Sequence, residues 1–417
     1  MMINKLSLVV VIIAAGMFLF LLYSFILTNY WGLGYPYNAF LCSPEDNFMD
    51  FYNVNYFVND FSPYSSNKHV SYPPFALLLA YPFSLFFQYT KYGSPAARDN
   101  FLAISSYVIL FLSFSCFLLK IIYQSIKGNG KWKDIIYTII LFLTYPVFFL
   151  FDRGNYVMLT FIFLYLFVFY YYVHPSWSLC FLSAAIAMKV YPIFFILLLL
   201  NQRRWKDICK VTLMTGCFCI IPLFLFKNSF WENLTNFFAN FFSFSGGYAT
   251  EIANMSWNLS LMGVIKLPIM LFNQGTVPFS VVIPYLLLVV LVFCIVLFLL
   301  NKEMQLARKV NYLLVMQLLI MPISVDYNLI YMYIPFLLLL KKEKLDRDDF
   351  FTIIIIALLF VPKAYGVLFH ERISFVTIQS FINPILLLSL IVYPFLKYVK
   401  SYLEKDCDRC ELCNVWM

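Results

Sequence analysis

Long apolar runs recur along this chain, and short polar segments separate them. Residues 6–27, "LSLVVVIIAAGMFLFLLYSFIL", form the first run and come close to the roughly 20 apolar residues that a transmembrane helix needs. No small-residue cleavage site follows, as a signal peptide would require, so we expect a retained helix. Further runs occupy residues 101–121, 135–150, 155–172, 178–188, 190–201, 208–226, 280–300, 310–324, 330–340, 350–366 and 379–396. The pattern predicts an all-α polytopic membrane protein with about 10–12 transmembrane helices.

Several of the runs are too short to cross a bilayer as single straight helices, which need about 17 residues or more. We therefore expect some helices to be broken, tilted or placed behind others. Irregular backbone at membrane depth is tolerated only where it is buried in protein or lines a cavity. The short runs thus predict a site embedded among the helices.

Basic residues gather in the short segments between apolar runs. The clusters lie at 120–133, 203–210, 302–309 and 341–347 and in the chain from 397 onward. Basic short loops face the cytoplasm, so the runs between successive clusters should cross the membrane in pairs. This places the N-terminus and the tail, 401–417, in the cytoplasm, and the turns "FDRGNY" and "MKVYP" on the outer side.

The pairing leaves one apolar run, 72–90, without a crossing. This run, "YPPFALLLAYPFSLFFQY", carries three prolines and an aromatic edge, as expected of a helix that lies in the membrane interface. Prolines 73 and 74 can begin that helix. The chain then reads as a single transmembrane domain, 1–400, with a first outer loop at 28–100 and a second large one at 227–278.

The composition supports a membrane protein. Hydrophobic residues make up 63% of the chain and charged residues 12%, against about 25% charged in ordinary soluble domains. The net charge of +8 comes from the loops that orient helices, so we expect the lipid bilayer as a partner and no nucleic acid.

Motifs for soluble cofactors and metals are absent from the sequence. It contains no DxD, GxGxxG, Walker or HExxH motif, which argues against nucleotide-sugar, dinucleotide and zinc-protease sites. The tail "CDRCELC" offers three thiols without a fourth ligand, a weak metal signal. We expect no cofactor and no metal.

Three ionisable residues on the predicted outer side are the main candidates for catalysis or substrate binding. Ionisable side chains at the ends of transmembrane helices cost free energy, so they indicate functional sites. Asp50 begins "DFYNVNYF", whose apolar spacing predicts a short helix over 50–60. Lys189 stands between two apolar runs, and Arg153 lies in an outer turn. Each has a simpler interpretation: a helix N-cap for Asp50, a snorkelling side chain for Lys189 and a pair with the neighbouring Asp152 for Arg153.

The order of several motifs resembles a GT-C membrane glycosyltransferase of glycosyltransferase family 87, which uses polyprenyl-phosphate sugars. The matching stretches are "DFYNVNYF", "SYPPFALLLAYPF", "YPVFFLFDRGNYVMLTFIFL", "AAIAMKVYPIFFILLLLNQRRW", "NMSWNLSLMGVIK" and "MPISVDYNLIYMYIPFLLLL". They cover most of the chain up to about residue 340. Each is weak alone, and their order and spacing together are specific.

The resemblance implies a GT-C fold in which juxtamembrane helices of the first outer loop cover a cavity. Asp50 matches the acidic position of the family's "DFxxYY"-like motif, although here the second aromatic is displaced to Tyr56. Lys189 matches the lysine of its "KxxP" turn. Arg153 and Asn155 match its "RGN" turn.

These matches assign roles to the candidates. Asp50 is the expected catalytic base, with Asp46 and Asp60 as its competitors in the same loop. Lys189 and Arg153 are expected to bind the donor phosphate. The remaining expected substrate-binding residues have aromatic or amide side chains, which suit sugars: Tyr52, Tyr72, Asn155, Trp257 and Asn258, of which Asn258 matches the family's "NxS" segment.

We therefore expect a glycosyltransferase of the bacterial cytoplasmic membrane with its active site on the outer face. It would move a sugar, with mannose as the family-level expectation, from a polyprenyl-phosphate donor to a glycan or glycolipid acceptor, with inversion. Two alternatives stay open: a lipid-linked-glycan flippase or transporter, and a polysaccharide polymerase or ligase. We find no internal repeat of the kind that transporters commonly show, and the first outer loop is richer than the late loop on which polymerases and ligases depend.

Overall fold

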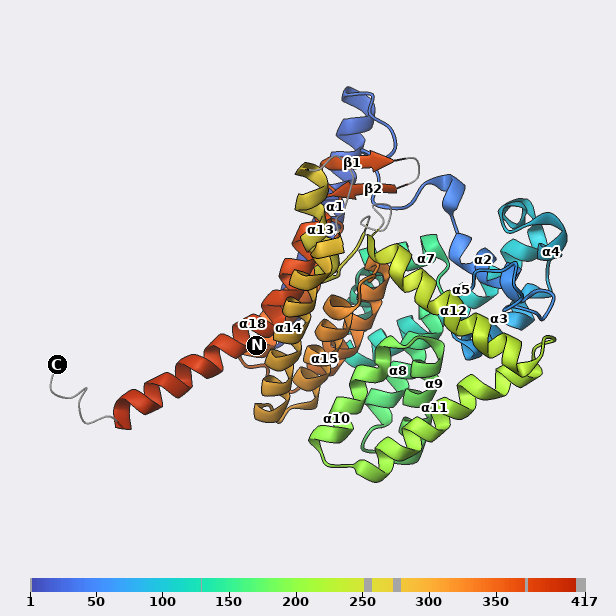
Figure 1. The fold of residues 1–417 in the computed structure, drawn as a ribbon. Helices are drawn as coiled ribbons and strands as arrows, with labels where there is room; N and C mark the ends of the chain where they lie inside the picture. Colours follow the sequence, from blue (N-terminus) through green and yellow to red (C-terminus); the bar gives the residue numbers. More distant parts are fainter. Residues whose placement is uncertain (1, 129, 251–256, 273–278, 372–373, 410–417) are drawn as a thin grey trace.

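The computed structural model describes residues 2–128, 130–250, 257–272, 279–371 and 374–409, and the fold is all-α and polytopic, as the sequence predicts. Within these described residues, five helices are individually long and apolar enough to cross a membrane. They are α1 (Met2–Tyr30), α5 (Phe101–Ile126), α11 (Trp205–Leu225), α14 (Val282–Lys302) and α18 (Gln379–Arg409). In Figure 1, α14 and α15 (Leu306–Ile320) stand beside α18, which runs out of the body toward the C-terminus.

The predicted run at 135–150 is not one helix. It divides into α6 (Lys131–Phe142) and α7 (Tyr145–Arg153), which meet at an angle of 51°. Pro146 explains the break, because proline donates no backbone hydrogen bond and its ring clashes with the carbonyl group four residues earlier, at Phe142. If the bent pair forms one span, the number of candidate spans rises to six.

The other apolar helices are short, as the sequence indicates. They are α8 (Val157–Tyr170), α9 (Pro175–Met188), α10 (Ile196–Asn201), α16 (Tyr333–Leu340) and α17 (Arg347–Leu359), with 3-10 turns η3 (Tyr191–Phe195) and η6 (Asp326–Met332) before α10 and α16. A helix of 14 residues, such as α8, is about 21 Å long, against about 30 Å of hydrocarbon. The expected 10–12 transmembrane helices are therefore reached only by counting such shorter elements.

The predicted first outer loop, residues 28–100, folds into short elements. They are η1 (Pro44–Asp46), α2 (Met49–Val58), α3 (Pro74–Ser84), α4 (Tyr89–Tyr92) and η2 (Pro95–Asp99). Pro74 begins α3, and Pro82 lies inside it. The 11-residue α3 is about 17 Å long, and the position of this segment at the membrane surface stays a prediction.

The predicted second outer loop, residues 227–278, contains α12 (Phe230–Thr250) and α13 (Leu261–Phe272). Glu251, a further acidic residue of the predicted outer face, and the tail beyond residue 409 lie outside the described residues. The run predicted over 350–366 ends earlier than expected, at Leu359, and an antiparallel hairpin of β1 (Val367–Glu371) and β2 (Ser374–Thr377) follows. These strands were not predicted from the sequence.

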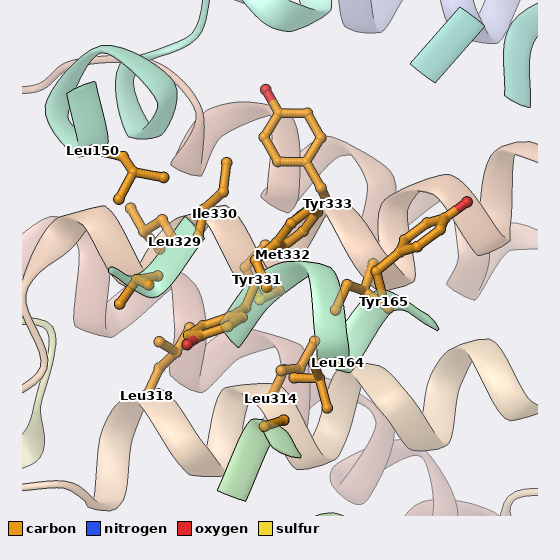
Figure 2. Close-up of a cluster of buried hydrophobic side chains, with 14 of the residues drawn as sticks. Leu150, Leu164, Tyr165, Leu314, Leu318, Leu329, Ile330, Tyr331, Met332 and Tyr333 are labelled. Carbon is orange, nitrogen blue, oxygen red and sulfur yellow. The ribbon is translucent and has the colours of Figure 1, made fainter. Parts of the chain in front are cut away.

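The core lies where η6 and the start of α16 meet α7, α8 and α15. Figure 2 shows Leu150, Leu164 and Leu314 around the segment from Leu329 to Tyr333, all of which is buried. Between helices in a membrane, association depends on close van der Waals packing rather than on exclusion of water. Dense packing of η6 therefore fixes the backbone next to Asp326 and Tyr327.

Candidate active site

A cluster of two carboxylates, a guanidinium and an amide joins the first outer loop to the end of α7. Arg153 Nη2 lies 2.5 Å from Asp50 Oδ1, and its Nη1 forms an ion pair with Asp46. Asn155 Nδ2 donates to Asp50 Oδ2 at 2.7 Å. The three side chains that make the ion pairs are 14–24% exposed. Arg153 thus pairs with Asp50 and Asp46, not with Asp152.

Gly154 explains why Arg153 and Asn155 can both reach Asp50. It ends α7 in the left-handed conformation, with φ of +65°, which glycine adopts without strain. A Cβ atom there would lie 3.0 Å from Phe51 Cβ and 3.3 Å from Phe48 Cα. The two segments are also joined by Phe48 N, which donates to the Asp152 carbonyl at 2.7 Å.

Gly154→Ala should lower the free energy of unfolding by about 1–3 kcal/mol, because it adds both a strained φ and a steric contact. Gly216→Ala is the matched control, since a Cβ at that position in α11 would meet nothing within 4 Å. Thermal unfolding of the purified variants in detergent measures both effects. Equal unfolding temperatures for the two variants would contradict this account of the turn.

Lys189 follows α9 directly and faces aromatic rings rather than a carboxylate. Its Nζ lies 5.8 Å from the ring centroid of Tyr72 and 5.5 Å from that of Tyr327. Among the described residues it has no ion pair. Burial lowers the pKa of Lys189 to about 8, and the negative charge of Asp50 acts in the opposite direction. The cation therefore lies within electrostatic reach of Asp50 and is available to meet an anion.

Tyr72 completes the wall between Lys189 and Asp50. Its hydroxyl interacts with the Asn155 side chain, and both burial and the negative charge of Asp50 raise the pKa of Tyr72. Tyr52 lies elsewhere, because residues two apart in a helix point to different faces. Its ring is buried against Phe48 and Tyr89, and its hydroxyl has no hydrogen-bond partner among the described residues.

Trp257 and Asn258 lie beside η6. The Trp257 ring packs against Phe149 and Phe375, with centroid distances of 5.4 and 5.0 Å, and its buried Nε1 has no partner in the described part of the chain. Asn258 Nδ2 donates to the Pro322 carbonyl at 3.2 Å, and Asn258 Oδ1 accepts from Ser324 N at 3.2 Å. The Asn258 amide thus holds the backbone that leads into η6.

Two residues of this region, Tyr191 and Tyr327, were not predicted from the sequence. Tyr327 lies under Lys189, and Tyr191 follows Lys189 closely in η3. Both stand in stretches that the motifs had already marked, "KVYP" and "SVDYN". Asp46, a predicted competitor of Asp50 for the role of base, shares Arg153 with Asp50.

The buried carboxylate of Asp326, the first residue of η6, holds this turn in place. Asp326 Oδ2 accepts from the hydroxyl of Tyr145 at 2.7 Å and from Gln379 Nε2 at 2.5 Å. Asn383 Nδ2 donates to Asp326 Oδ1 at 3.2 Å. The network ties α7 and α18 to the residue next to Tyr327.

The described residues contain no group of three or more His, Cys, Asp and Glu side chains that could hold a metal ion. The side chains of the cluster and its surroundings supply a fixed carboxylate, two cations and a tyrosine wall. Such a set can accept a proton and stabilise an anion within one site.

Comparison with known proteins identifies the family of the chain. A family model described as glycosyltransferase family 87 matches residues 70–322, more than half of the chain. The match includes Tyr72, Arg153, Lys189 and Asn258, and it begins after Asp50. No curated protein gives a sequence match to this chain. Because the family model covers most of the helices that surround the site, the chain is a member of glycosyltransferase family 87, and it is a membrane glycosyltransferase.

Proposed function

We propose that this protein transfers a sugar, with mannose as the expected one, from a polyprenyl-phosphate donor to a glycan or glycolipid acceptor. The reaction takes place on the outer face of the bacterial cytoplasmic membrane, inverts the anomeric carbon and uses no metal. The observation that carries the proposal is the position of Asp50. It is held by Arg153 and Asn155 and lies within electrostatic reach of the Lys189 cation.

Asp50 has the geometry of a base. Each carboxylate oxygen has about two lone pairs. Arg153 uses one on Oδ1 and Asn155 uses one on Oδ2. A lone pair remains on each oxygen to accept the proton of an acceptor hydroxyl, and the two bonds fix the direction in which it points.

The transfer step combines one proton transfer with one substitution at the anomeric carbon. The acceptor oxygen gives its proton to Asp50 and forms a bond to the anomeric carbon. The bond from that carbon to the phosphate oxygen breaks, and the electron pair leaves with the lipid phosphate. Lys189, with Arg153, offsets the charge of the leaving phosphate through charge-assisted contacts.

A transfer assay in proteoliposomes tests the function directly. A panel of short-chain polyprenyl-phosphate sugars serves as donor and a panel of alkyl glycosides as acceptor. Transfer with any lipid-phosphate sugar, and none with nucleotide sugars, supports the proposal. Transfer from a nucleotide sugar alone would overturn it, and net movement of the lipid donor across the bilayer without transfer would favour the flippase alternative.

Lys189→Ala should weaken donor binding about tenfold or more, the effect of losing one charge-assisted contact of about 1.5–3 kcal/mol. In the wild type, kcat/KM for the donor should fall as the pH rises through about 8, because the free enzyme's Lys189 then loses its proton and its attraction for phosphate. Lys189→Arg stays protonated across this range and should lose the fall. An unchanged pH profile in Lys189→Arg would contradict the assignment.

The membrane orientation is tested by cysteine labelling of intact cells. Ser94→Cys, in the first outer loop, should react with an impermeant thiol reagent added outside. Lys131→Cys, at the start of α6, should react only after the membrane is opened. The reverse result would place the Asp50 cluster on the cytoplasmic side.

A further inference from the structure

Three tyrosines, Tyr72, Tyr191 and Tyr327, lie beside Asp50 and Lys189. The Lys189 ammonium faces the rings of Tyr72 and Tyr327. The hydroxyls of these two tyrosines lie within electrostatic reach of Asp50 and of the Tyr191 hydroxyl. A hydroxyl in this position can donate a hydrogen bond to the same anion that the ammonium attracts.

The hydroxyls of the three tyrosines differ in how they are engaged. That of Tyr72 interacts with the Asn155 side chain. That of Tyr191 donates to the Ile323 carbonyl at 3.5 Å. The Tyr327 hydroxyl has no hydrogen-bond partner in the described part of the chain. Its proton is therefore available to a bound substrate.

Tyr327 is also the accessible residue of η6. The other residues of this turn are buried, whereas the Tyr327 side chain is half-buried. Lys189, which faces the Tyr327 ring, is half-buried as well. The Tyr327 side chain thus lies on the side of η6 that meets the site, while its neighbours pack in the core.

The position of the Tyr327 ring is set before a substrate binds. The ring stacks on that of Phe149, with centroids 6.3 Å apart and an angle of 21° between the planes. The preceding residue, Asp326, is held by hydrogen bonds from side chains of α7 and α18. A hydrogen-bond donor that is fixed in this way needs no reorganisation during the reaction.

Negative charge on the phosphate grows during the proposed reaction. The sugar donor is a phosphodiester with a single negative charge, and loss of the sugar leaves a phosphate monoester with about 1.5–2 negative charges at neutral pH. Lys189 supplies one positive charge, whereas Arg153 shares its charge between Asp46 and Asp50. A further hydrogen bond to the phosphate would therefore stabilise the transition state more than the bound sugar donor.

We propose that Tyr327 is a further catalytic residue, whose hydroxyl donates a hydrogen bond to the leaving phosphate beside the Lys189 ammonium. The inference rests on the proposed function. Tyr327 keeps its proton, because a phenol has an ordinary pKa of about 10 and a phosphate monoester one of about 6. The proton of the acceptor hydroxyl still passes to Asp50, and the electron pair of the broken bond still passes to the phosphate.

Tyr327→Phe tests the hydroxyl alone, because it keeps the ring that faces Lys189 and stacks on Phe149. The single-turnover rate should fall about 10- to 100-fold, the effect of losing one hydrogen bond to a charged group. Affinity for the sugar donor should change less than about threefold. An unchanged rate would overturn the inference. So would a loss of donor affinity as large as the loss of rate, because the hydroxyl would then bind the substrate and not the developing charge.

Binding of geranyl phosphate, a short mimic of the leaving lipid phosphate, gives a second measurement that needs no turnover. This monoester already carries the charge that the sugar donor lacks. Tyr327→Phe should therefore weaken its binding about tenfold at neutral pH, as measured by titration calorimetry of the purified enzyme in detergent. Equal affinity in the wild type and in Tyr327→Phe would contradict the proposed hydrogen bond.

Tyr331→Phe is the matched control. Tyr331 belongs to the same turn, but its side chain lies in the buried core, near Leu318 in Figure 2. This variant should transfer the sugar and bind geranyl phosphate within about threefold of the wild type. Equal losses in Tyr331→Phe and Tyr327→Phe would overturn the inference, because they would arise from a disturbed turn and not from the missing Tyr327 hydroxyl.

Failure of this inference and failure of the proposed function give different results. A wild-type enzyme that uses lipid-phosphate sugars, together with an equally fast Tyr327→Phe variant, would overturn the role of Tyr327 alone. A wild-type enzyme that uses no lipid-phosphate sugar would overturn both.

Discussion

Asp50→Asn should lower the rate of sugar transfer by about 10²-fold or more, with donor binding nearly unchanged. The substitution keeps the size of the side chain and removes the group that takes the proton. Arg153 can still donate to the new amide oxygen, whereas the amide nitrogen faces the Nδ2 atom of Asn155, which now donates to Asp50. The local cost is one hydrogen bond, so the folded protein should survive. Single-turnover rates, measured with bound donor, separate the chemical step from binding.

Asp60→Asn is the matched control. Asp60 lies in the same loop, but its carboxylate forms an ion pair with Lys68, whose Nζ is 2.6 Å from Asp60 Oδ1. Its substitution should change the transfer rate by less than about threefold. Asp46→Asn neutralises the other carboxylate that pairs with Arg153. A near wild-type rate in Asp50→Asn together with an inactive Asp46→Asn would move the base to Asp46.

Arg153→Gln should have an equally large effect, on both activity and stability. It removes the cation that Asp46 and Asp50 share and leaves the two carboxylates close together. Their side chains are only 24% and 18% exposed, so water screens the repulsion between them only in part. Removing one partner from a buried ion pair costs about 3–5 kcal/mol, and partial exposure brings this site toward the lower figure. We expect a lower unfolding temperature and a loss of transfer of about 10²-fold, because Asp50 loses its orientation.

A double variant distinguishes two effects of Arg153→Gln: repulsion between Asp46 and Asp50, and loss of the orientation of Asp50. Arg153→Gln with Asp46→Asn removes the like-charge contact, so it should regain part of the stability but none of the activity. Arg204→Gln is the control for losing an arginine–aspartate pair, since Arg204 binds Asp207 at the start of α11, away from the cluster. A double variant as unstable as Arg153→Gln would show that repulsion between Asp46 and Asp50 is not the cause.

The five long spans could be predicted from the sequence, because hydrocarbon imposes a length and a composition on each transmembrane helix. The break at Thr144 lay inside an apolar run, where the count of apolar residues could not reveal it, although Pro146 was the physical cause. The hairpin of β1 and β2 was missed for another reason. Its strands occupy the stretch between two predicted spans, and their pairing depends on contacts such as that of Phe375 with Trp257.

The candidate site could be predicted from the sequence where a motif contained a charged residue. Asp50, Arg153 and Lys189 come from distant positions, and the structure gathers them at one place. Tyr327 could not be chosen in this way, because its contact with Lys189 depends on the fold. Asp46 was a candidate from the sequence, but its ion pair with Arg153 became visible only in the structure. The Asn258 amide is bonded to backbone groups in the structure, and its contact with substrate stays a prediction.

The attachment of α12 to the first outer loop has a consequence for mutational tolerance. Asn236 Nδ2 donates to the Tyr64 carbonyl at 2.7 Å, Asn240 Nδ2 donates to the Lys68 carbonyl at 3.1 Å, and Lys227 N donates to the Phe61 carbonyl at 3.0 Å. All three bonds end on main-chain oxygens, which every residue type provides. The exposed positions Ser66, Asn67 and His69 can therefore change identity while the loop keeps its path. This stretch can therefore vary in sequence beside a cluster whose side chains depend on one another through ion pairs and hydrogen bonds.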